Sequence, residues 1–455
     1  MERVLDEKEA AHWVYRGEGA ANIVVAYNGS FPELVGKVLR IQKIPEKGSN
    51  GIIGSSGFSA DELLLWKDHK DLVLSPNREI AAQLYVAHVM SQLLGSKHVD
   101  AGIQVLVSKE FLGAVEKNIN SKRPAWRIRA ARIDRHCKYV LLISDHSCFP
   151  RVSGVVKDDP CISVEIKPKC GFLPTSKYIA QKNIIKKIIT RFKMHQTLKF
   201  HEKEISEISE YDPLDLFSGS KDRMHKALRA LYDTPQNNFR VFFDGSLILG
   251  GLGGAADSTT KLMGEKLEDV LKSIIQSDDG LRTRIFLELI IETIHKSGVL
   301  DRLLDVQKLD NCDVEGAIHA YYNIVSQPCI ACKELGEDNL LHNRNPLHSL
   351  SLDESLKIVK DFLISATVKD CSLMMCFKPR GVVSNSSYNS VQLESTGQVF
   401  EYKAYFIDLD LKPLNKMEHY YKLDQKIVRC YNKIAMEECL AKRDDGSIEG
   451  YKSTN

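Results

Sequence analysis

Two aspartates and a lysine alternate with apolar residues along the stretch 405–413, which reads Tyr-Phe-Ile-Asp-Leu-Asp-Leu-Lys-Pro. The alternation predicts a strand that places Asp408, Asp410 and Lys412 on one face. Two carboxylates beside a cation could hold a divalent metal next to a phosphate group. The same pattern is also typical of a surface strand whose charges are solvated. Its chemistry therefore depends on what the rest of the chain places beside it.

Two other stretches carry charged groups at the predicted ends of strands. Asp370 follows a helix predicted over 356–369 and stands at the mouth of an apolar strand. A strand is also predicted over 161–169, and Glu165, Lys167 and Lys169 share one of its faces if it stays extended past the proline at 168. Two lysines beside a cleft would suit an anionic substrate, whereas on an edge strand they would only deter pairing.

A glycine turn lies near the start of the chain, between two predicted strands. Gly17 and Gly19 in this turn could lay backbone N–H groups over phosphates, although a plain hairpin turn needs no ligand. The turn is not a dinucleotide fingerprint, because a strand follows it and Asn22 replaces the third glycine. The next predicted strand carries Lys37 and Arg40, which are candidate cations for nucleotide phosphates or solvated charges on an edge strand.

A long helix is predicted from residue 176 to about residue 210, with four isoleucines in its apolar stripe. Arg191, His195 and Lys199 follow at intervals of four residues and share another face. A bound polyanion would explain three cationic residues at that spacing, and so would a solvated helix face. Further on, an Asp-Gly turn predicts a hairpin over 236–249, with Asn237, Asn238 and Arg240 at its entry.

Two cysteines and two histidines could form a metal site. Cys329 and Cys332 form a Cys-x-x-Cys pair, with His319 ten residues before it and His348 sixteen residues after it. Two cysteines and two histidines are a complete tetrahedral zinc set, and a closed set would be structural. A redox pair or unrelated residues remain alternatives. His342 and Cys312 could compete as ligands.

Composition limits the classes of protein that the chain could represent. Its 455 residues fit two to three domains or two lobes with a shared cleft. Lysine and arginine total 62 against 60 acidic residues, so no global field favours nucleic acid. No apolar run is long enough to span a membrane, and the N-terminus lacks a signal-peptide core. Eleven scattered cysteines favour an intracellular setting, with the cytoplasm and the nucleus as candidates.

Four short motifs, taken in order, resemble the inositol-pentakisphosphate 2-kinase family, and its plant members closely. They are Arg16-Gly17-Glu18-Gly19 with Asn22, the stretch Glu165-Ile166-Lys167-Pro168-Lys169, Met194-His195-Gln196 with Leu198-Lys199, and Asp408-Leu409-Asp410-Leu411-Lys412-Pro413. Each motif is weak alone, but the four keep the family's order and span nearly the whole chain.

The resemblance implies an α+β chain with a two-lobed, kinase-like fold that is distantly similar to protein kinases. The N-lobe would cover residues 1–149, and the C-lobe, residues 150–455, would hold a zinc-bearing insertion. The implied reaction transfers the ATP γ-phosphate to the 2-hydroxyl of inositol 1,3,4,5,6-pentakisphosphate and produces the hexakisphosphate, phytic acid. A kinase of other positional specificity and a non-catalytic inositol-phosphate scaffold are the alternatives. We expect a monomer.

The resemblance also implies roles for individual residues. Asp370, Lys167 and Asp408 would be catalytic, with Asp408 as a Mg²⁺ ligand. The residues expected to hold ATP are Arg16, Gly17, Gly19, Asn22, Arg40, His146 and Glu165. The residues expected to bind substrate phosphates are Arg127, Lys169, Lys199, Asn237, Asn238, Arg240, Lys412, Lys416 and Tyr420. The expected ligands of a structural Zn²⁺ are His319, Cys329, Cys332 and His348.

Overall fold

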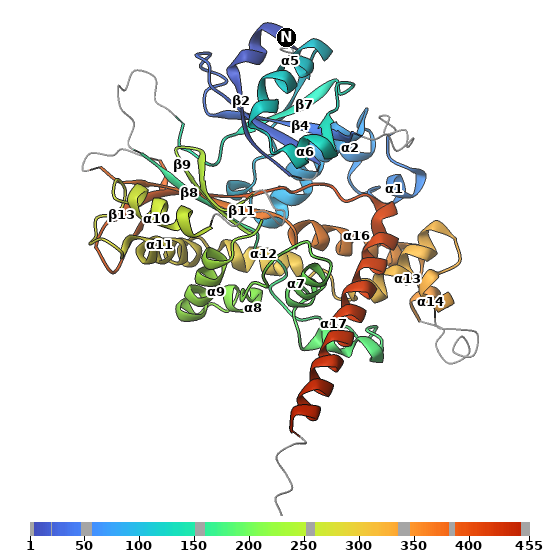
Figure 1. Cartoon of the computed structure of the whole chain (residues 1–455). Helices are drawn as coiled ribbons and strands as arrows, with labels where there is room; N and C mark the ends of the chain where they lie inside the picture. The colour runs from blue at the N-terminus through green and yellow to red at the C-terminus, as the bar shows by residue number, and fades with distance from the viewer. Residues whose placement is uncertain are drawn as a thin grey trace, which may run out of the picture.

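The structure is a computed structural model that describes residues 4–19, 21–46, 57–150, 160–251, 260–334, 346–381 and 387–446. Two β-sheets organise these residues, one above the other in Figure 1, and helices surround the lower sheet. The chain is therefore a mixed α+β protein, as its sequence predicts. The expected competing zinc ligand His342 lies outside the described residues.

The first sheet is built from the N-terminal third of the chain. In spatial order its strands are β1 (Val4–Leu5), β5 (Ile103–Val107), β7 (Tyr139–Ser144), β4 (Lys37–Pro45), β3 (Asn22–Tyr27) and β2 (Trp13–Glu18), and β6 (Ala131–Ile133) pairs with β4. Helix α5 (Lys109–Ile119) buries Phe111, Leu112 and Val115 in the core that this sheet shares with η1 (Glu7–His12). The predicted strands on either side of the glycine turn are confirmed as β2 and β3, and the strand that follows them is β4.

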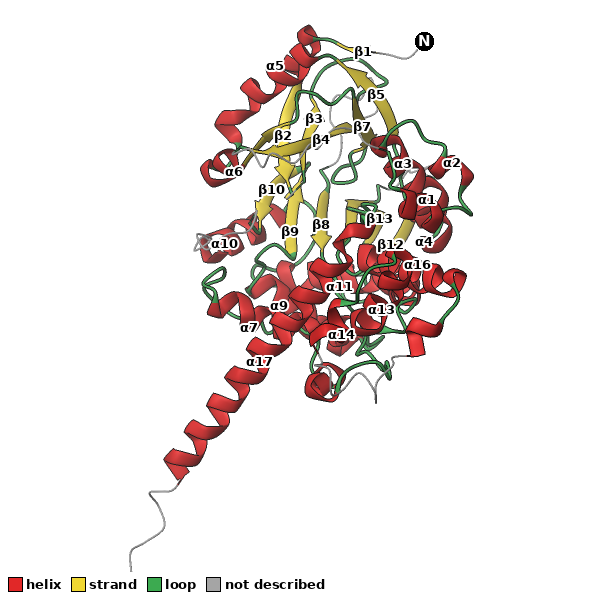
Figure 2. Ribbon diagram, turned by 90° about the vertical axis from the view of Figure 1, so that its right-hand side faces the viewer, coloured by secondary structure: helices red, strands yellow, loops and turns green. Residues whose placement is uncertain are grey.

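The second sheet is antiparallel throughout, and it lies below the first sheet in Figure 2. Its strands, in spatial order, are β10 (Ser246–Leu249), β9 (Phe239–Phe243), β8 (Ile162–Ile166), β11 (Ser372–Pro379), β13 (Val399–Ile407) and β12 (Asn389–Gln392). The predicted Asp-Gly hairpin is confirmed as β9 and β10. Asp244 and Gly245 in its turn have φ angles of 46° and 75°, which the sequence pair Asp-Gly tolerates well.

Helices fill the space beneath the second sheet and beside it (Figures 1 and 2). They are η5 (Gln181–Lys187), α7 (Arg191–His201), α8 (Pro213–Leu216), α9 (Lys221–Asp233), α10 (Thr260–Leu271), α11 (Arg282–Ser297), α12 (Val299–Gln307), α13 (Asp313–Val325), α14 (Ile330–Glu334), η6 (Pro346–Ser349), α16 (Leu352–Val368), η7 (Leu414–Lys416) and α17 (Met417–Gly446). The distal part of α17 projects away from the body of the molecule.

A segment from the N-terminal third of the sequence packs with the second sheet. It comprises α1 (Ala60–Leu65), α2 (Lys70–Val73), α3 (Arg78–Tyr85), η2 (Val86–Met90), α4 (Ser91–Leu94) and η3 (Ser96–His98). Trp66, Tyr85 and Leu94 from this segment belong to the larger hydrophobic core, together with Val164 and Leu373 of the second sheet. The short elements η4 (Asn120–Lys122) and α6 (Ala125–Ala130) stay beside the first sheet.

Three sequence-based predictions of local structure are wrong in their extent. The helix predicted from residue 176 to about 210 is broken into η5 and α7, because Thr190 caps a new helix by accepting from the Lys193 N–H. The strand over 161–169 ends at Ile166, and the strand over 405–413 ends at Ile407. Lys169 and Asp408 both have φ 62°, which no extended strand allows.

Candidate active site

Three segments that are far apart in the sequence meet at one end of the second sheet. In the register of β11, Leu373 lies opposite Ile166 of β8 and Ser372 lies opposite Ile407 of β13. The residues just outside those strand ends are therefore neighbours. The Lys167 ammonium donates to the Asp408 carboxylate at 3.2 Å and lies 3.4 Å from the Asp370 carbonyl oxygen. The structure thus brings the three expected catalytic residues together.

The backbone at this end of the sheet adopts an uncommon conformation. Asp408 and Lys169 lie in the left-handed region of backbone space with φ 62°, and neither is a glycine. That conformation costs about 1 to 2 kcal/mol per residue for an L-amino acid. Such strain persists where surrounding contacts hold the residue, and it concentrates at functional sites. At Asp408 the contacts are Arg40 and Lys167, which reach its two carboxylate oxygens at 3.1 and 3.2 Å.

Neighbouring cations keep both aspartates ionised at neutral pH. Burial by itself would raise the pKa of Asp408, but the charges of Arg40 and Lys167 outweigh it and lower the pKa to about 2. Burial opposes ionisation of Asp370 as well, yet the charges of Lys169, Lys167 and Lys412 lower its pKa. Two permanent carboxylates among several cations could hold a divalent metal and accept a bond from a hydroxyl group.

The expected ATP ligand Glu165 is engaged by other residues of the chain. Ser372 Oγ donates to one of its carboxylate oxygens at 2.8 Å, and Arg240 donates to the other at 3.0 Å. Arg240 also donates from Nε to the Gly251 carbonyl at 3.0 Å. Glu165 therefore fixes the side chain of Arg240, which the family resemblance leads us to expect at the substrate phosphates.

Several expected substrate ligands surround Asp370. Lys169 donates to its carboxylate at 3.2 Å, and Lys412 is close enough for its charge to lower the pKa of Asp370. Burial lowers the pKa of Lys169, and the charge of Lys199 on α7 lowers it further. Burial raises the pKa of Tyr420 on α17 to about 12, with a further contribution from the charge of Asp370.

His195 lies among the residues that surround Asp370. The sequence places it only on the same helix face as Arg191 and Lys199. Burial lowers the pKa of His195 to about 3, and the nearby charges of Lys199 and Arg191 add to this effect. The signal in the sequence was the spacing of Arg191, His195 and Lys199. The tertiary structure adds Lys169 and Asp370 to their surroundings.

The remaining expected substrate ligands lie in different settings. Asn238 is buried at 3% exposure, accepts the Lys167 N–H at its carbonyl oxygen, and has a side-chain oxygen without a partner in the described part of the chain. Asn237 beside it is half-buried. Arg127 on α6 donates to the Gly19 carbonyl at 3.1 Å and stacks over Trp126 at 4.1 Å. Lys416 is exposed at the end of η7.

The glycine turn between β2 and β3 is open on the side where side chains would stand. A Cβ atom added at Gly17 or Gly19 would meet nothing within 4 Å, so a ligand could approach this backbone closely. The turn is closed by a bond from the Gly19 N–H to the Asn22 carbonyl at 3.0 Å. Arg16 beside it donates to Asp145 at 3.0 Å.

His146 follows Asp145 at the end of the first sheet and is buried. Its ring stacks on Tyr405 with centroids 4.0 Å apart, and its Nε2 lies 3.3 Å from the Asp100 carboxylate. Burial lowers the pKa of His146. This expected ATP ligand therefore lies where the first sheet meets β13.

A buried ion cluster that sequence reasoning missed supports the glycine turn. Glu18 accepts from Lys43 at 2.7 Å and from Arg123 at 2.9 and 3.1 Å, and these three side chains are at most 2% exposed. Lys43 also donates to the Gly19 carbonyl at 2.7 Å. The glutamate between two glycines was the signal in the sequence. Its two partners come from positions that no local pattern connects.

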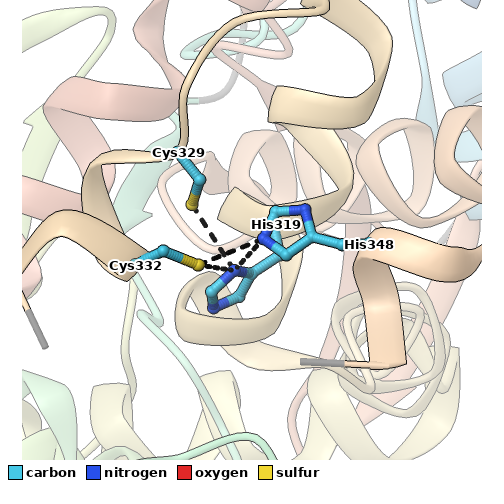
Figure 3. Close-up of side chains that lie close together, drawn as sticks. All are labelled: His319, Cys329, Cys332 and His348. Carbon is cyan, nitrogen blue, oxygen red and sulfur yellow. Dashed lines mark hydrogen bonds between the residues drawn. The ribbon is translucent and has the colours of Figure 1, made fainter. Parts of the chain in front are cut away.

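The expected zinc ligands converge in one place, as Figure 3 shows. His319 Nδ1 lies 2.9 Å from His348 Nε2, 3.4 Å from Cys329 Sγ and 3.6 Å from Cys332 Sγ, and the Cys332–His348 distance is 3.2 Å. Zinc bonds of the usual lengths would set ligand atoms about 3.3 to 3.8 Å apart in a tetrahedron. The donor set therefore fits a closed zinc site after small movements.

An outer partner orients one of these ligands. His348 Nδ1 lies 3.1 Å from Asn323 Oδ1, and the Asn323 amide donates to the Leu347 carbonyl at 2.6 Å. With its Nδ1–H donated to Asn323, His348 presents Nε2 to the cluster. Metal-binding histidines commonly have such a partner.

A second acidic cluster is already filled by a lysine. Asp313, Glu315 and Asp424 surround the Lys186 ammonium, which donates to Glu315 at 3.1 Å, to Asp424 at 2.8 Å and also to Asp313. The ammonium supplies the positive charge that two buried carboxylates and one partly buried carboxylate need. This cluster joins α13 to α17.

Within the described ranges, no helix has the combination of length and apolar character that a transmembrane helix needs.

The class of protein that this geometry fits is a phosphotransferase with an anionic substrate. The sequence profile of the family described as "Inositol-pentakisphosphate 2-kinase" matches residues 15–426. The chain belongs to the inositol-pentakisphosphate 2-kinase family.

Curated relatives of the same name cover nearly the whole chain. The inositol-pentakisphosphate 2-kinase of Arabidopsis thaliana is 54% identical over 439 residues, which is 95% of this chain and 96% of the relative. The inositol-pentakisphosphate 2-kinase IPK1 of Oryza sativa subsp. japonica is 54% identical over 435 residues, with the same coverage. The relative from Danio rerio is 28% identical over 489 residues, which is 94% of each chain.

Proposed function

We propose that this protein transfers the γ-phosphate of ATP to the 2-hydroxyl of inositol 1,3,4,5,6-pentakisphosphate and so produces inositol hexakisphosphate. The observation that carries the proposal is the meeting of Lys167, Asp370 and Asp408 at one end of the second sheet, in a chain of this family. Phosphoryl transfer depends mainly on positioning and on neutralising negative charge, and this arrangement is suited to both.

Each of the three residues has a role that its position supports. The Asp370 carboxylate is open to solvent on one side, and nearby lysines lower its pKa, so it can accept a hydrogen bond from the attacking hydroxyl and orient it. The Lys167 ammonium lies between Asp370 and Asp408, where it can neutralise the transferred phosphoryl group. Asp408 would be a ligand of Mg²⁺, which supplies charge neutralisation to the donor phosphates when bound.

The cations around Asp370 suit a substrate with five phosphates. Substrate phosphates would be bound by Arg127, Lys169, Lys199, Asn237, Asn238, Arg240, Lys412, Lys416 and Tyr420. Charge-assisted hydrogen bonds to phosphate are strong and directional, so such a set could fix which hydroxyl faces Asp370. ATP would lie beside the glycine turn and be held by Arg16, Gly17, Gly19, Asn22, Arg40, His146 and Glu165.

We also propose a two-lobed, kinase-like organisation with an N-lobe at 1–149 and a C-lobe at 150–455. Two separate hydrophobic cores, one for each sheet, support this division. The helical segment 60–98 belongs to the C-lobe by its packing, although it falls within the N-lobe range.

We propose a structural Zn²⁺ bound by His319, Cys329, Cys332 and His348 in an insertion of the C-lobe. Four ligands would leave no open position for a substrate, so the ion would stabilise the fold. The ten cysteines whose side chains the structure places form no disulfide, which supports a reducing compartment such as the cytoplasm or the nucleus. We expect the protein to act as a monomer.

The direct test incubates the purified protein with the pentakisphosphate, ATP and Mg²⁺ and identifies the product by NMR. Phosphate on the 2-hydroxyl is the expected result, and Asp408→Asn should slow its formation by about a hundred-fold or more. Asp353→Asn is a matched control, because Asp353 is 79% exposed and pairs with Lys67 on the surface. Phosphate on another hydroxyl would favour a kinase of different specificity, and no turnover would favour a scaffold.

A further inference from the structure

Asp410 forms an ion pair with Arg40, the residue proposed above as an ATP ligand. Arg40 lies in β4 of the first sheet, and Asp410 follows β13 of the second sheet. The Arg40 Nη2 atom donates to Asp410 at 2.9 Å and to Asp408 at 3.1 Å. A single nitrogen of the Arg40 guanidinium therefore binds two carboxylates, and these two ion pairs connect the first sheet to the end of β13.

The other N–H groups of Arg40 remain available. A guanidinium carries five N–H donors in a planar fork. Both ion pairs use Nη2, and within the described part of the chain Nε and Nη1 of Arg40 have no hydrogen-bond partner. Neither atom is among the buried polar atoms that lack a partner, so both reach solvent at the site. Clamping Nη2 therefore fixes the direction in which Nε and Nη1 point.

The backbone of Asp410 is held independently of its side chain. The Thr367 hydroxyl donates to the Asp410 carbonyl oxygen at 3.1 Å. The carboxylate is 46% exposed, and Arg40 is its only paired cation among residues whose positions the structure gives. Removing this charge should therefore leave the fold intact and alter mainly the orientation of Arg40.

We propose that Asp410 is a positioning residue that aims the free N–H groups of Arg40 at the nucleotide phosphates. Asp408 also accepts from Arg40, but its other carboxylate oxygen accepts from Lys167. The Asp410 carboxylate pairs with Arg40 alone among the residues that the structure describes. The inference rests on the proposed function, because it takes Arg40 to be an ATP ligand. Asp410 acts through Arg40 and not as a ligand of the metal.

A positioning role for Asp410 predicts a change in ATP affinity opposite in sign to the one that its charge alone would cause. Removing a negative charge near phosphates should strengthen nucleotide binding if only Coulomb attraction matters. If Asp410 positions Arg40, then Asp410→Asn should weaken the binding of metal-free ATP. A half-exposed ion pair supports an effect of about three- to five-fold.

The experiment measures ATP binding by calorimetry in EDTA for the wild type, Asp410→Asn, Arg40→Gln and the double variant. We expect Asp410→Asn to weaken binding three- to five-fold and to have no further effect in the Arg40→Gln background. Steady-state kinetics should show a higher KM for ATP, an unchanged dependence on Mg²⁺, and partial rescue by Asp410→Glu. Asp353→Asn, the exposed control, should match the wild type.

Four results would overturn the assignment. They are tighter binding by Asp410→Asn, no change in binding, a loss that appears only with Mg²⁺ present, or a loss that persists at full size in the Arg40→Gln background. If the wild type binds ATP neither in EDTA nor with Mg²⁺ present, the proposed function falls as well. Normal binding by the wild type with any of these four results overturns the role of Asp410 alone.

Discussion

The buried ion cluster beneath the glycine turn gives a prediction that can be worked out in magnitude. Glu18 has no exposed side-chain surface, and its partners Lys43 and Arg123 are 2% and 1% exposed. Glu18→Gln keeps the shape of the side chain but leaves two buried cations, 2.7 to 3.1 Å from the former carboxylate, without a counter-charge. Removing one partner of a buried ion pair costs about 3 to 5 kcal/mol.

We therefore expect Glu18→Gln to lower the free energy of unfolding by about 3 to 5 kcal/mol. The loss should concentrate in the first sheet, because Glu18 belongs to β2 and Lys43 to β4. Urea unfolding followed by circular dichroism gives the total, and hydrogen exchange in β2 and β3 locates it. Lys43→Met combined with Glu18→Gln should cost less than the sum of the two single changes, since the pair is removed together.

The matched control is again Asp353→Asn, which breaks a surface ion pair and should cost at most about 1 kcal/mol. A loss for Glu18→Gln as small as that of the control would refute the reasoning. So would a full-sized loss without any increase in hydrogen exchange at β2 and β3. Either result would mean that the cluster does not hold the glycine turn.

Three further predictions follow from the site and its surroundings. Asp408→Asn should lower kcat by about a hundred-fold or more while pentakisphosphate binding is kept, because a charge that acts on the transferred group is lost; kinetics and calorimetry would separate the two, and near-normal turnover would contradict the role. Metal analysis should find about one zinc per chain, and Cys332→Ser should lower both the zinc content and the melting temperature; far less than one zinc in the wild type would count against the site. The pKa of His195 falls from 6.5 to about 3 on folding, so the folded state binds fewer protons than the unfolded state. The contribution of His195 to the free energy of unfolding is therefore highest above pH 6.5 and decreases as the pH falls toward 3. His195→Gln should therefore be more stable relative to the wild type at pH 5 than at pH 7.5, by about 1 to 2 kcal/mol in urea unfolding, and an equal difference at both pH values would refute it.

Helices α13 and α17 connect the proposed zinc ligands to one of the proposed substrate ligands. Helix α13 carries His319 and also Tyr322, whose hydroxyl donates to Glu418 of α17 at 2.7 Å. Lys186 joins the same two helices through Asp313 and Asp424. Because α17 carries Tyr420, removal of the proposed zinc should loosen α13 and with it a proposed substrate contact.

The sequence by itself determined the local elements whose signals lie within a few residues. The Asp-Gly hairpin at β9 and β10 and the strands around the glycine turn follow from turn chemistry and alternation. The resemblance of four ordered motifs identified the family. The set of cysteines and histidines was also visible, because zinc chemistry demands those residue types.

The tertiary structure alone decided how the charged residues are combined. Alternation placed Asp408 and Asp410 on an extended strand, but the strand ends at Ile407, and Asp408 takes a left-handed conformation that its contacts with Arg40 and Lys167 hold. Neither the Glu18 cluster nor the Arg40–Asp410 pair could be predicted. Their partners come from different strands and sheets, and such pairing depends on packing and burial over long sequence separations, which no local pattern records.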